Sequence, residues 1–538
     1  MASTQDVFIR KSSGLTRQIS ARDALMYCTQ NPGPLYALMY AIWAPAFYPA
    51  ASMPLAVCWV LLMFPIAGLY WYFSVSMPRS GGEYVYVSRT LHPALGLWAS
   101  FMISITAVSW TGTIQDWWMK WGLNDMIRSI GIARQNQGLI HLANTMDGQW
   151  VRFFIGTFAL ALTGYLFLLG TKAMMRVSYW AVGMAWLAVI ILGVLVVVTG
   201  KHGFERNFSR LSGTDVQTII TAGKHAGAIF QIGFLATLYA GVTWVNLNTL
   251  GQTFSANLAG EIRGVGKSQA LALFGALAIQ MAAWFAIYSF IDLGFGRDFM
   301  QSITALWNSG SAQYPAVLAH ANPHVSGEPM PQLLLAFLTG NPFILALFGI
   351  CFIVATWISL AGLAFAPIRN VFAWSFDRLV PTKLSEIRTR YRAPVGAIVV
   401  VILTAFLFHI LEIFFPNTVA AVAFTIIAWF LGWIVLGIAG MVYPYRRKEM
   451  FEAGPPSTQR RIGGIPVISI LGFLTLAVSV FTEWAVGQAF FSGSLEFSQY
   501  AVVGVMAAIP IVIYVWAHNY HKRKGIPLSL QFSQVPPE

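Results

Sequence analysis

The sequence predicts an all-α membrane protein with about twelve transmembrane helices. Of its 538 residues, 57% are hydrophobic and only 10% are charged, whereas a soluble domain carries about a quarter charged residues. Apolar runs of about 20 residues, the length that crosses a hydrocarbon core of roughly 30 Å, recur along the whole chain. Lys and Arg fall mostly in the short loops between these runs.

The apolar runs define spans 1 to 12 in chain order. Their limits are 22–43, 52–75, 93–114, 151–170, 174–199, 227–250, 267–293, 332–366, 395–415, 418–442, 464–486 and 498–518. The run at 332–366 is long for one crossing, so we expect it to tilt or to project into the cytoplasm. Residues 1–21 are polar and lack the apolar core of a cleavable signal peptide.

The distribution of basic residues predicts that both ends of the chain are cytoplasmic. With a cytoplasmic N-terminus, about 24 of the 33 Lys and Arg residues lie inside, against about nine in the reverse orientation. The tails 1–21 and 519–538 are then cytoplasmic, and 115–150, 200–226 and 294–331 are outer loops that we expect to hold short helices. We expect the protein in the cell (plasma) membrane.

The net charge of +13 raises the question of a nucleic-acid partner. These charges are spread through loops at the membrane edges instead of being gathered on one face. Topology and anionic lipid headgroups explain them better, so the lipid bilayer is the expected partner and nucleic acid is not.

Span 1 contains the stretch CTQNPGPLYAL, in which Asn31, Pro32, Gly33 and Pro34 interrupt a segment that otherwise reads as a buried helix. A proline inside a helix removes a backbone hydrogen bond and clashes with the preceding turn. In lipid each unpaired backbone group costs several kcal/mol, so broken backbone persists only where protein or a water-filled cavity surrounds it. A simple proline kink is the alternative interpretation.

Span 6 carries a second candidate interruption, LATLYAGVTWVNLNTLG. Tyr239, Ala240 and Gly241 stand at its centre, and Trp244 follows within a run of polar residues. A glycine used for close helix packing is the alternative here. An interrupted helix exposes free N–H groups on one half and free C=O groups on the other, so it offers both partial charges that a zwitterion needs. Tyr239 and Trp244 are candidates for a lid or an apolar side-chain pocket.

The spacing of the two interruptions predicts an internal repeat. Spans 1 and 6 are five apart, so a second five-span unit enters the membrane from the opposite side. The inverted units are 22–199 and 227–442, and spans 11 and 12 follow at 464–518. Paired interrupted helices at matching positions of two inverted halves indicate a transporter binding site. We therefore expect the substrate to bind at the breaks in helices 1 and 6.

Two longer motifs lie in cytoplasmic loops. MPRSGGEYVYVSRTLHPALGLWASF at 77–101 has Gly81 and Gly82, which permit a sharp turn, and Tyr84, which we expect to anchor at headgroup level. RNVFAWSFDRLVP at 369–381 places Arg369 and Asp377 about two helical turns apart, so we expect them to share a face.

These motifs resemble the amino acid–polyamine–organocation superfamily of transporters, in particular its amino acid permeases. The first resembles the P-x-S-G-G-x-Y-x-Y loop after span 2, and the second resembles R-x-x-x-A-x-x-x-D-x-x-x-P after span 8. The resemblance implies a five-plus-five inverted repeat with two additional helices. It also implies that both motifs take part in closing a cytoplasmic gate.

The resemblance implies a secondary active transporter, or permease, that moves amino acids or related small amines by alternating access. The two prolines of span 1 depart from the glycine-rich stretch of many relatives and remove two N–H donors, so carboxylate binding is expected to be weaker or differently arranged. The coupling mode stays open among proton coupling, sodium symport, exchange and facilitated diffusion. Thr356 and Ser359 on span 8 are candidate sodium ligands, although such hydroxyls more often bond their own backbone.

Other classes of function fit the sequence less well. No enzyme is expected, because the nine histidines are scattered and show no HExxH or comparable spacing, and no cofactor is expected either. A substrate-sensing receptor or a channel-like facilitator on the same fold is the alternative. Trp110, Trp117, Trp118 and Trp121 are interpreted as an interfacial belt around the outer end of span 3.

Overall fold

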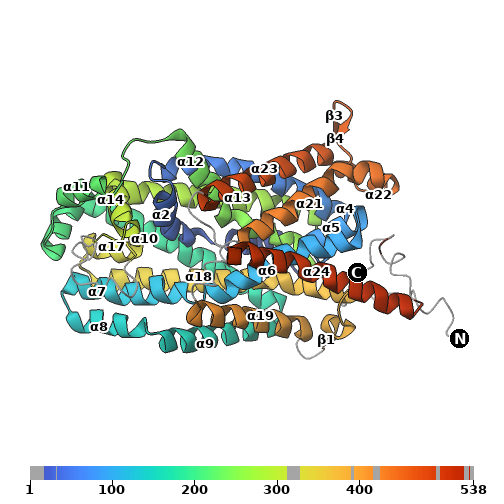
Figure 1. Ribbon diagram of the computed structural model, residues 1–538, viewed down its shortest axis with the longest axis horizontal. Coiled ribbons are helices and arrows are strands. Elements are labelled where there is room, and N and C mark those ends of the chain that lie inside the picture. The colour runs from blue at the N-terminus through green and yellow to red at the C-terminus, as the bar shows by residue number, and fades with distance from the viewer. Residues whose placement is uncertain are drawn as a thin grey trace.

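The computed structural model describes residues 17–31, 33–311, 328–388, 393–415, 425–491, 497–525 and 532. The described chain is almost entirely helical (Figure 1). Its strands form two short antiparallel hairpins: β1 (Ile387–Arg388) pairs with β2 (Ala393–Pro394), and β3 (Arg461–Ile462) pairs with β4 (Ile465–Pro466). The prediction of an all-α membrane protein is confirmed.

Within the described residues, ten helical segments are long and apolar enough to cross a membrane. They correspond to the predicted spans 2–5 and 7–12, so the two predicted spans without such a segment are spans 1 and 6. One of the ten consists of three consecutive elements, α3 (Met53–Ala56), η2 (Val57–Met63) and α4 (Phe64–Ser76). Five others are single helices: α9 (Gln149–Leu168), α19 (Val395–Phe414), α21 (Thr425–Arg446), α23 (Val467–Phe491) and α24 (Phe497–Arg523).

Spans 1 and 6 consist of short pieces. Span 1 is divided into α1 (Ala21–Thr29), the 3-10 helix η1 (Pro34–Tyr36) and α2 (Ala37–Phe47). Span 6 is divided into α12 (Phe234–Ala240), the π-helix η4 (Gly241–Val245) and the 3-10 helix η5 (Asn246–Asn257), with η6 (Ala259–Glu261) beyond it. The assignment of these spans to two inverted units at 22–199 and 227–442 stays a prediction.

Three spans continue beyond their predicted outer ends. α6 (Pro93–Thr113) leads through the π-helix η3 (Trp118–Asn124) into α7 (Asp125–Arg134), and α13 (Val265–Ile291) leads through η7 (Asp292–Gly296) into α14 (Arg297–Asn308). α10 (Thr171–Ser212) bends at Gly200, whose φ is 63°. With α8 (Gln137–Met146) and α11 (Val216–His225), these extensions confirm the short helices expected at 115–150, at 200–226 and in the described part of 294–331, of which residues 312–327 lie outside the described residues.

The single span predicted at 332–366 is wrong in its limits. Residues 331–337 form the separate short helices α17 (Pro331–Leu334) and η8 (Leu335–Phe337), and the long helix α18 runs from Pro342 to Phe376. The Asn341 side chain accepts a hydrogen bond from the Phe343 amide, and Pro342 occupies the first turn, which together start α18 there. The apolar run concealed this boundary because hydropathy does not register a helix cap.

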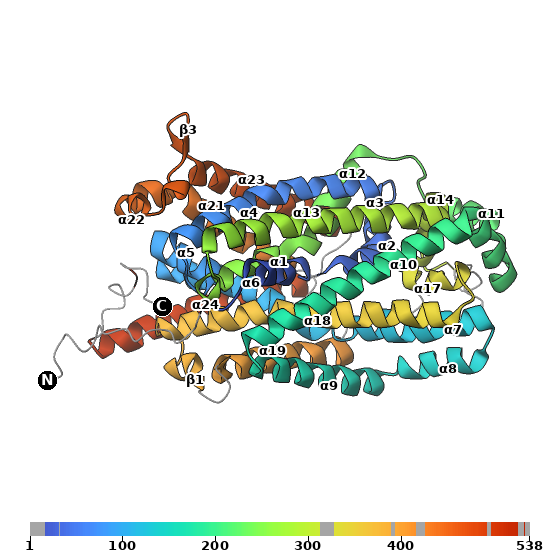
Figure 2. The same ribbon diagram turned by 180° about the vertical axis from the view of Figure 1, so that it is seen from behind.

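The two ends of the molecule differ in their elements. At one end, here called the terminal end, lie α5 (Gly82–Thr90), the β3–β4 hairpin, α22 (Lys448–Glu452) and the last turns of α24; α8, α11 and α14 lie at the distal end (Figures 1 and 2). Between these ends α6 packs against α18, α19 and α21, and α1 packs against α13. The short helices η9 (Thr382–Ser385) and η10 (Pro456–Thr458) complete the described elements.

Candidate functional site

The interruption of span 1 lies between two helices with clear local causes. α1 begins with a capping box, in which the Ser20 hydroxyl accepts from the Asp23 amide and the Asp23 carboxylate accepts from the Ser20 amide. α1 ends at Thr29, and Gly33 has φ 107° and ψ 148°, a conformation that a residue with a side chain rarely adopts. Pro34 then opens η1. Pro32 lies outside the described residues.

Three elements meet at the interruption at very short range. A Cβ atom on Gly362 of α18 would lie 2.2 Å from Asn31 Oδ1 and 2.5 Å from Gln30 Nε2. A Cβ on Gly251 of η5 would lie 2.6 Å from Asn31 Cβ, and one on Gly33 would lie 3.2 Å from Ser359 Oγ. Span 1 is therefore held at its interruption by α18 and η5, on positions where only glycine fits.

Buried polar groups without partners lie at this junction, on Gln30, Asn31 and Ser359, and on the adjoining helix η5, on Asn248 and Gln252. Among the described residues, both side-chain amide atoms of Gln30 and Gln252, both of Asn248, Asn31 Oδ1 and Ser359 Oγ make no hydrogen bond. All five side chains are at most 1% exposed. A buried polar group without a partner costs about 1–3 kcal/mol. Such a concentration of unpaired amide and hydroxyl groups favours a small polar ligand or water at this place.

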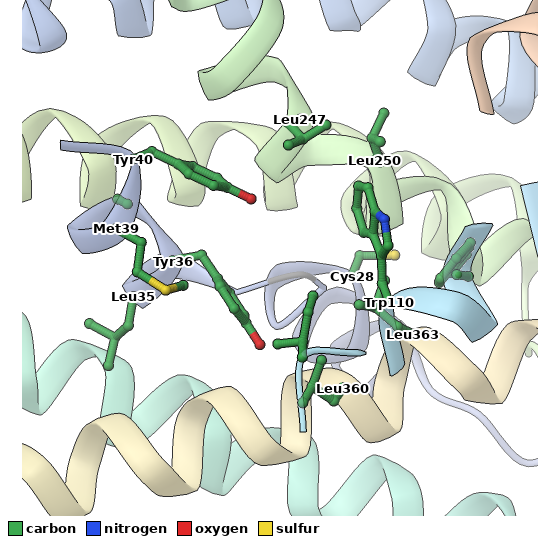
Figure 3. Close-up of a cluster of buried hydrophobic side chains, with 14 of the residues drawn as sticks. Cys28, Leu35, Tyr36, Met39, Tyr40, Trp110, Leu247, Leu250, Leu360 and Leu363 are labelled. Carbon is green, nitrogen blue, oxygen red and sulfur yellow. The ribbon is translucent and has the colours of Figure 1, made fainter. Parts of the chain in front are cut away.

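Apolar side chains line the same region from four elements. Figure 3 shows Cys28, Leu35, Tyr36, Met39, Tyr40, Trp110, Leu247, Leu250, Leu360 and Leu363 around the interruption, contributed by span 1, α6, η5 and α18. The Tyr36 hydroxyl points toward α18 and donates to the Thr356 carbonyl at 3.4 Å. The candidate site thus combines neutral polar groups with apolar and aromatic walls.

The predicted residues of span 6 contact different parts of the molecule. Gly241 keeps right-handed helical angles, and a Cβ there would lie 2.6 Å from the Ala56 carbonyl, so it allows close packing on span 2. Tyr239 packs against Tyr48 and Trp484, and Ala240 is fully buried. Span 6 changes from α to π to 3-10 winding here and shows no extended break. Span 6 reaches the candidate site further along, where Gly251 of η5 lies against Asn31.

Trp244 belongs to an aromatic cluster on the distal side of the interruption. Trp43 of α2 is at its centre, with ring centroids 5.1 Å from those of Trp117 and Trp121 and 6.0 Å from that of Trp244. Trp244 also contacts Tyr40, at 5.6 Å. Trp43 Nε1 donates to the Glu328 carboxylate at 3.1 Å.

The interpretation of four tryptophans as an interfacial belt is wrong. Trp110, Trp118 and Trp121 are at most 9% exposed, and Trp117 is partly buried against Trp43. The continuation of span 3 through η3 places Trp117 and Trp121 against Trp43 of span 1, and Trp110 of α6 packs on Trp429. A position near a predicted span end was therefore a poor guide to exposure.

The two candidate sodium ligands differ in their contacts. The Thr356 hydroxyl donates to the Phe352 carbonyl of its own helix at 2.7 Å. The Ser359 hydroxyl has no such partner and faces Gly33. No group of three or more His, Cys, Asp or Glu side chains that could hold a metal ion occurs in the part of the chain that the structure describes. A sodium role for the pair stays a prediction.

At the terminal end, the glycine motif contributes to a buried ion pair. Gly81 has φ 108°, and a Cβ on it would lie 2.6 Å from Ala373, so α5 approaches α18 closely. The Tyr84 hydroxyl donates to Asp377 Oδ2 at 2.8 Å, and Arg89 Nη1 lies 2.7 Å from the same oxygen. Tyr84 is fully buried, so its predicted place at headgroup level is wrong: its hydroxyl is occupied by a carboxylate inside the protein.

Arg369 and Asp377 bind separate partners. Arg369 Nε donates to Glu261 Oε1 at 2.7 Å, and its Nη2 donates to the Thr171 hydroxyl at 2.9 Å. Asp377 caps the C-terminal end of α18 and pairs with Arg89. The two residues therefore tie α18 to spans 5 and 6 on one side and to α5 on the other.

Between these pairs lies Glu83, a residue that the motif analysis did not single out. Its carboxylate accepts from Asn370 Nδ2 at 2.8 Å, from Asn257 Nδ2 at 3.3 Å and from the Tyr70 hydroxyl at 3.4 Å. Burial raises the pKa of Glu83 to about 7. Four elements, α4, α5, η5 and α18, thus meet on one carboxyl group.

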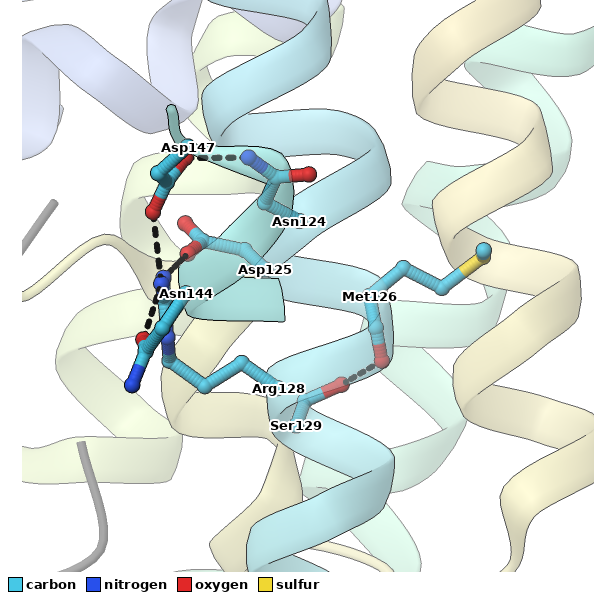
Figure 4. Close-up of polar contacts among 7 residues, drawn as sticks. All are labelled: Asn124, Asp125, Met126, Arg128, Ser129, Asn144 and Asp147. Atoms are coloured by element: carbon cyan, nitrogen blue, oxygen red, sulfur yellow. Dashed lines mark hydrogen bonds and ion pairs between the residues drawn. The ribbon is translucent and has the colours of Figure 1, made fainter. Parts of the chain in front are cut away.

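A further buried charge cluster fixes the distal end. Arg128 of α7 pairs with Asp125 at 2.9 Å and with Asp147 at 2.7 Å, and it donates to Asn144 at 3.0 Å (Figure 4). Asn124 also donates to Asp147. These contacts hold α7 against α8.

Sequence reasoning missed most of the polar residues of the candidate site. Gln30, Asn248 and Gln252 look like ordinary polar residues in a span, and only their burial without partners identifies them. The available signal was the density of amide side chains in NLNTLGQTF, which is high for a segment at membrane depth.

A bundle of apolar spans around an interrupted, buried first span is the architecture of a membrane transporter. The chain belongs to the amino acid permease family, because the family model with that description matches residues 38–515. This confirms the resemblance drawn from the loop motifs. Nothing among the curated proteins matches the chain. The protein is accordingly an integral membrane transporter of a small molecule, and the family points away from an enzyme.

Proposed function

We propose that the protein is a secondary transporter that moves an amino acid or a related small amine by alternating access. The observation that carries the proposal is the buried junction of Asn31 and Gly33 with Ser359 and Gly362, at which Gln30, Asn31 and Ser359 keep unpaired polar atoms. Groups held without partners in the protein interior are available to a ligand that supplies them.

The chemistry of this junction favours a neutral zwitterion with an apolar side chain. The polar groups that surround it are amides and hydroxyls, and its walls are Leu, Tyr, Trp and Met side chains (Figure 3). The buried acids Glu83 and Glu261 are engaged at the terminal end. A cationic amine would need a carboxylate or several carbonyl groups at the junction itself.

The contacts on either side of the junction support two gates. On the distal side, the cluster of Trp43, Trp117, Trp121 and Trp244 covers span 1. At the terminal end, the pairs of Arg89 with Asp377 and of Arg369 with Glu261 connect α18 to α5 and to the end of span 6. Alternating access then requires each set of contacts to separate in turn while the other stays closed.

The terminal end is assigned to the cytoplasm of a cell expressing the protein at its plasma membrane. The reason is the excess of basic residues in the loops on that side. The coupling ion is assigned to neither proton nor sodium, and the experiment below varies both.

The test is thermal unfolding of the full-length protein, purified in detergent, with each of the twenty amino acids, common polyamines and simple amines at several pH and sodium values. A ligand that binds only the folded protein raises its melting temperature. Any ligand found is then tested for uptake into proteoliposomes. Asn31→Ala and Gln252→Ala are expected to abolish the shift, whereas Asn136→Ala, in an exposed distal turn, serves as the matched control.

Two results would contradict the proposal. Saturable binding without flux in proteoliposomes would favour a substrate-sensing receptor on the same fold. A ligand whose shift survives both Asn31→Ala and Gln252→Ala would place the binding site elsewhere in the molecule.

A further inference from the structure

A pocket opens at the terminal end, away from the candidate substrate site. Its volume is about 370 Å³, and it is lined by Gln18, Ile19, Asp23, Thr171, Lys172, Met175, Arg176 and Tyr179. One wall is the segment that leads into α1, and the other is the first two turns of α10. This volume falls in the range of about 300–1,000 Å³ that is usual for small-molecule sites.

The side chains that line this pocket carry more positive than negative charge. Lys172 and Arg176 are both exposed and form no ion pair or hydrogen bond within the described residues. The single acid of the lining, Asp23, is already engaged: its carboxylate accepts from the Ser20 amide at 2.9 Å and from the Tyr179 hydroxyl at 3.1 Å. Two cations with free donors therefore face a pocket whose acid is occupied, which suits an anion with several oxygen atoms.

The same face of α10 becomes apolar as it leaves the pocket. Lys172, Arg176 and Trp180 are spaced four residues apart, so they lie one above another on the helix. Trp180, which is 62% exposed, begins an apolar stripe on this face of α10. The stripe continues at helical spacing through the exposed side chains Leu187, Ile190, Val194 and Val197. A cationic start followed by an apolar stripe matches an amphiphile with an anionic head and long hydrocarbon chains.

The pocket is connected to the contacts that close the terminal end. The amides of Gln18 and Ile19 both donate to the Glu261 carbonyl at 2.9 Å, and the Thr171 hydroxyl donates to the Glu261 carboxylate at 2.8 Å. Glu261 is the partner of Arg369. The two walls of the pocket thus meet at one ion pair between spans 6 and 8.

We propose that this pocket binds the phosphodiester headgroup of one anionic phospholipid, with its acyl chains along the exposed apolar stripe of α10. Lys172 and Arg176 hold the phosphate oxygens, and Trp180 contacts the first carbons of the chains. A headgroup that fills the pocket lies between its two walls, so the bound lipid keeps the start of α1 docked on α10 and stabilises the contacts that close the terminal end. The proposal concerns a lipid site and does not depend on the identity of the transported substrate.

The test uses the full-length protein, delipidated in a neutral detergent, and measures its melting temperature during titration with phosphatidylglycerol. Phosphatidylcholine and the soluble headgroup analogue glycerol 3-phosphate are titrated in parallel. We expect a saturable rise with phosphatidylglycerol alone. The variant K172Q/R176Q is expected to weaken phosphatidylglycerol binding by about 10- to 30-fold, from the contribution of two basic residues near an anionic headgroup.

The matched control is R460Q/R461Q, which removes two exposed basic residues of the β3–β4 hairpin at the same end of the molecule. It is expected to bind phosphatidylglycerol like the unmodified protein. W180A tests the chain contact and is expected to weaken phosphatidylglycerol binding less than K172Q/R176Q does. All these side chains are exposed, so the unliganded melting temperatures should agree and verify folding.

Three outcomes would overturn the proposal. Unchanged phosphatidylglycerol affinity in K172Q/R176Q would exclude the pocket. An equal loss in R460Q/R461Q would show that the whole basic surface, and no particular site, attracts the lipid. A rise with glycerol 3-phosphate equal to that with phosphatidylglycerol would identify a site for soluble phosphate compounds.

Discussion

At the scale of single residues, the interruption of span 1 depends on positions that have no room for a side chain. Gly362 lies so close to Asn31 and Gln30 that a methyl group on it would clash with both side chains, and Gly33 adopts a backbone conformation that favours glycine. These two glycines fix where the chain leaves its helix and what it contacts there. A change at either one acts directly on the geometry of the candidate substrate site.

We predict that Gly362→Ala destabilises the protein by about 1–3 kcal/mol and weakens binding of any ligand found by the thermal screen. The added Cβ would displace Asn31 Oδ1, which lies only 2.2 Å away, and forcing atoms into a packed core costs energy of this size. The control is Gly183→Ala on α10, where the new Cβ would have no neighbour within 4 Å. Equal melting temperatures for the two variants would contradict the prediction.

Glu83 gives a second prediction at this scale. Burial raises the pKa of its carboxyl group from 4.5 to about 7, so between about pH 5 and pH 7 the folded chain keeps a proton that the unfolded chain has lost. The free energy of unfolding therefore falls as pH rises through this interval. Glu83→Gln is neutral at every pH and removes this contribution.

The measurement is the melting temperature of both proteins from pH 5 to pH 8. We expect similar values at pH 5 and a more stable Glu83→Gln variant above pH 7. Parallel curves over the whole range would mean that Glu83 does not titrate there.

At the scale of elements, α18 joins the candidate site to the terminal end. Its middle carries Ser359 and Gly362 at the interruption of span 1, and its last turns carry Arg369, Asn370 and, at the C-terminal cap, Asp377. One helix thus holds the ligand-facing junction and all three polar connections to α5, η5 and η6. A displacement of α18 relative to span 1 is therefore expected to change the geometry of the ion pairs at the terminal end.

Asp377→Asn tests this element. The substitution leaves the Arg89 guanidinium, which is fully buried, without its carboxylate partner, and removing one member of a buried pair costs about 3–5 kcal/mol. We expect a lower melting temperature and a terminal end that opens more readily, which an introduced cysteine near Asn257 reports through faster maleimide labelling.

The control for this variant is Glu452→Gln in the exposed pair with Lys448 at the same end of the molecule. That pair spans 3.8 Å with more than half of each side chain exposed, so its loss is expected to cost at most about 1 kcal/mol. Unchanged transport and labelling in Asp377→Asn would argue against a gating role for this residue.

At the scale of the whole molecule, charge asymmetry predicts how the protein is inserted. In a background with the exposed Cys58 replaced by Ala, a single cysteine is placed at Arg134 of α7 or at Arg461 of β3. Intact cells treated with a membrane-impermeant maleimide should label Arg134→Cys and spare Arg461→Cys, because the proposed orientation places the distal end outside the cell. Labelling of Arg461→Cys alone would reverse the proposed orientation.

The sequence predicted the class of fold and most of the spans, but it predicted less about the candidate site. Hydropathy located the ten long apolar helices found among the described residues, and the glycine and proline pair at Gly33 and Pro34 located the junction of α1 and α2. Asn31, Gly33 and Ser359 do lie together there. Tyr239 and Gly241 pack elsewhere, and Gln30, Asn248 and Gln252 were not anticipated.

The sequence by itself determined the features that depend on short stretches of the chain: which segments are apolar enough to span a membrane, where a helix must end, and which loop motifs indicate the family. The tertiary structure alone decided which distant residues meet. Tyr84 became a buried donor to Asp377, 293 positions away, and Trp121 turned inward onto Trp43. The physical reason is that hydropathy and backbone sterics act locally, whereas burial and partner choice arise only when separate helices pack against one another.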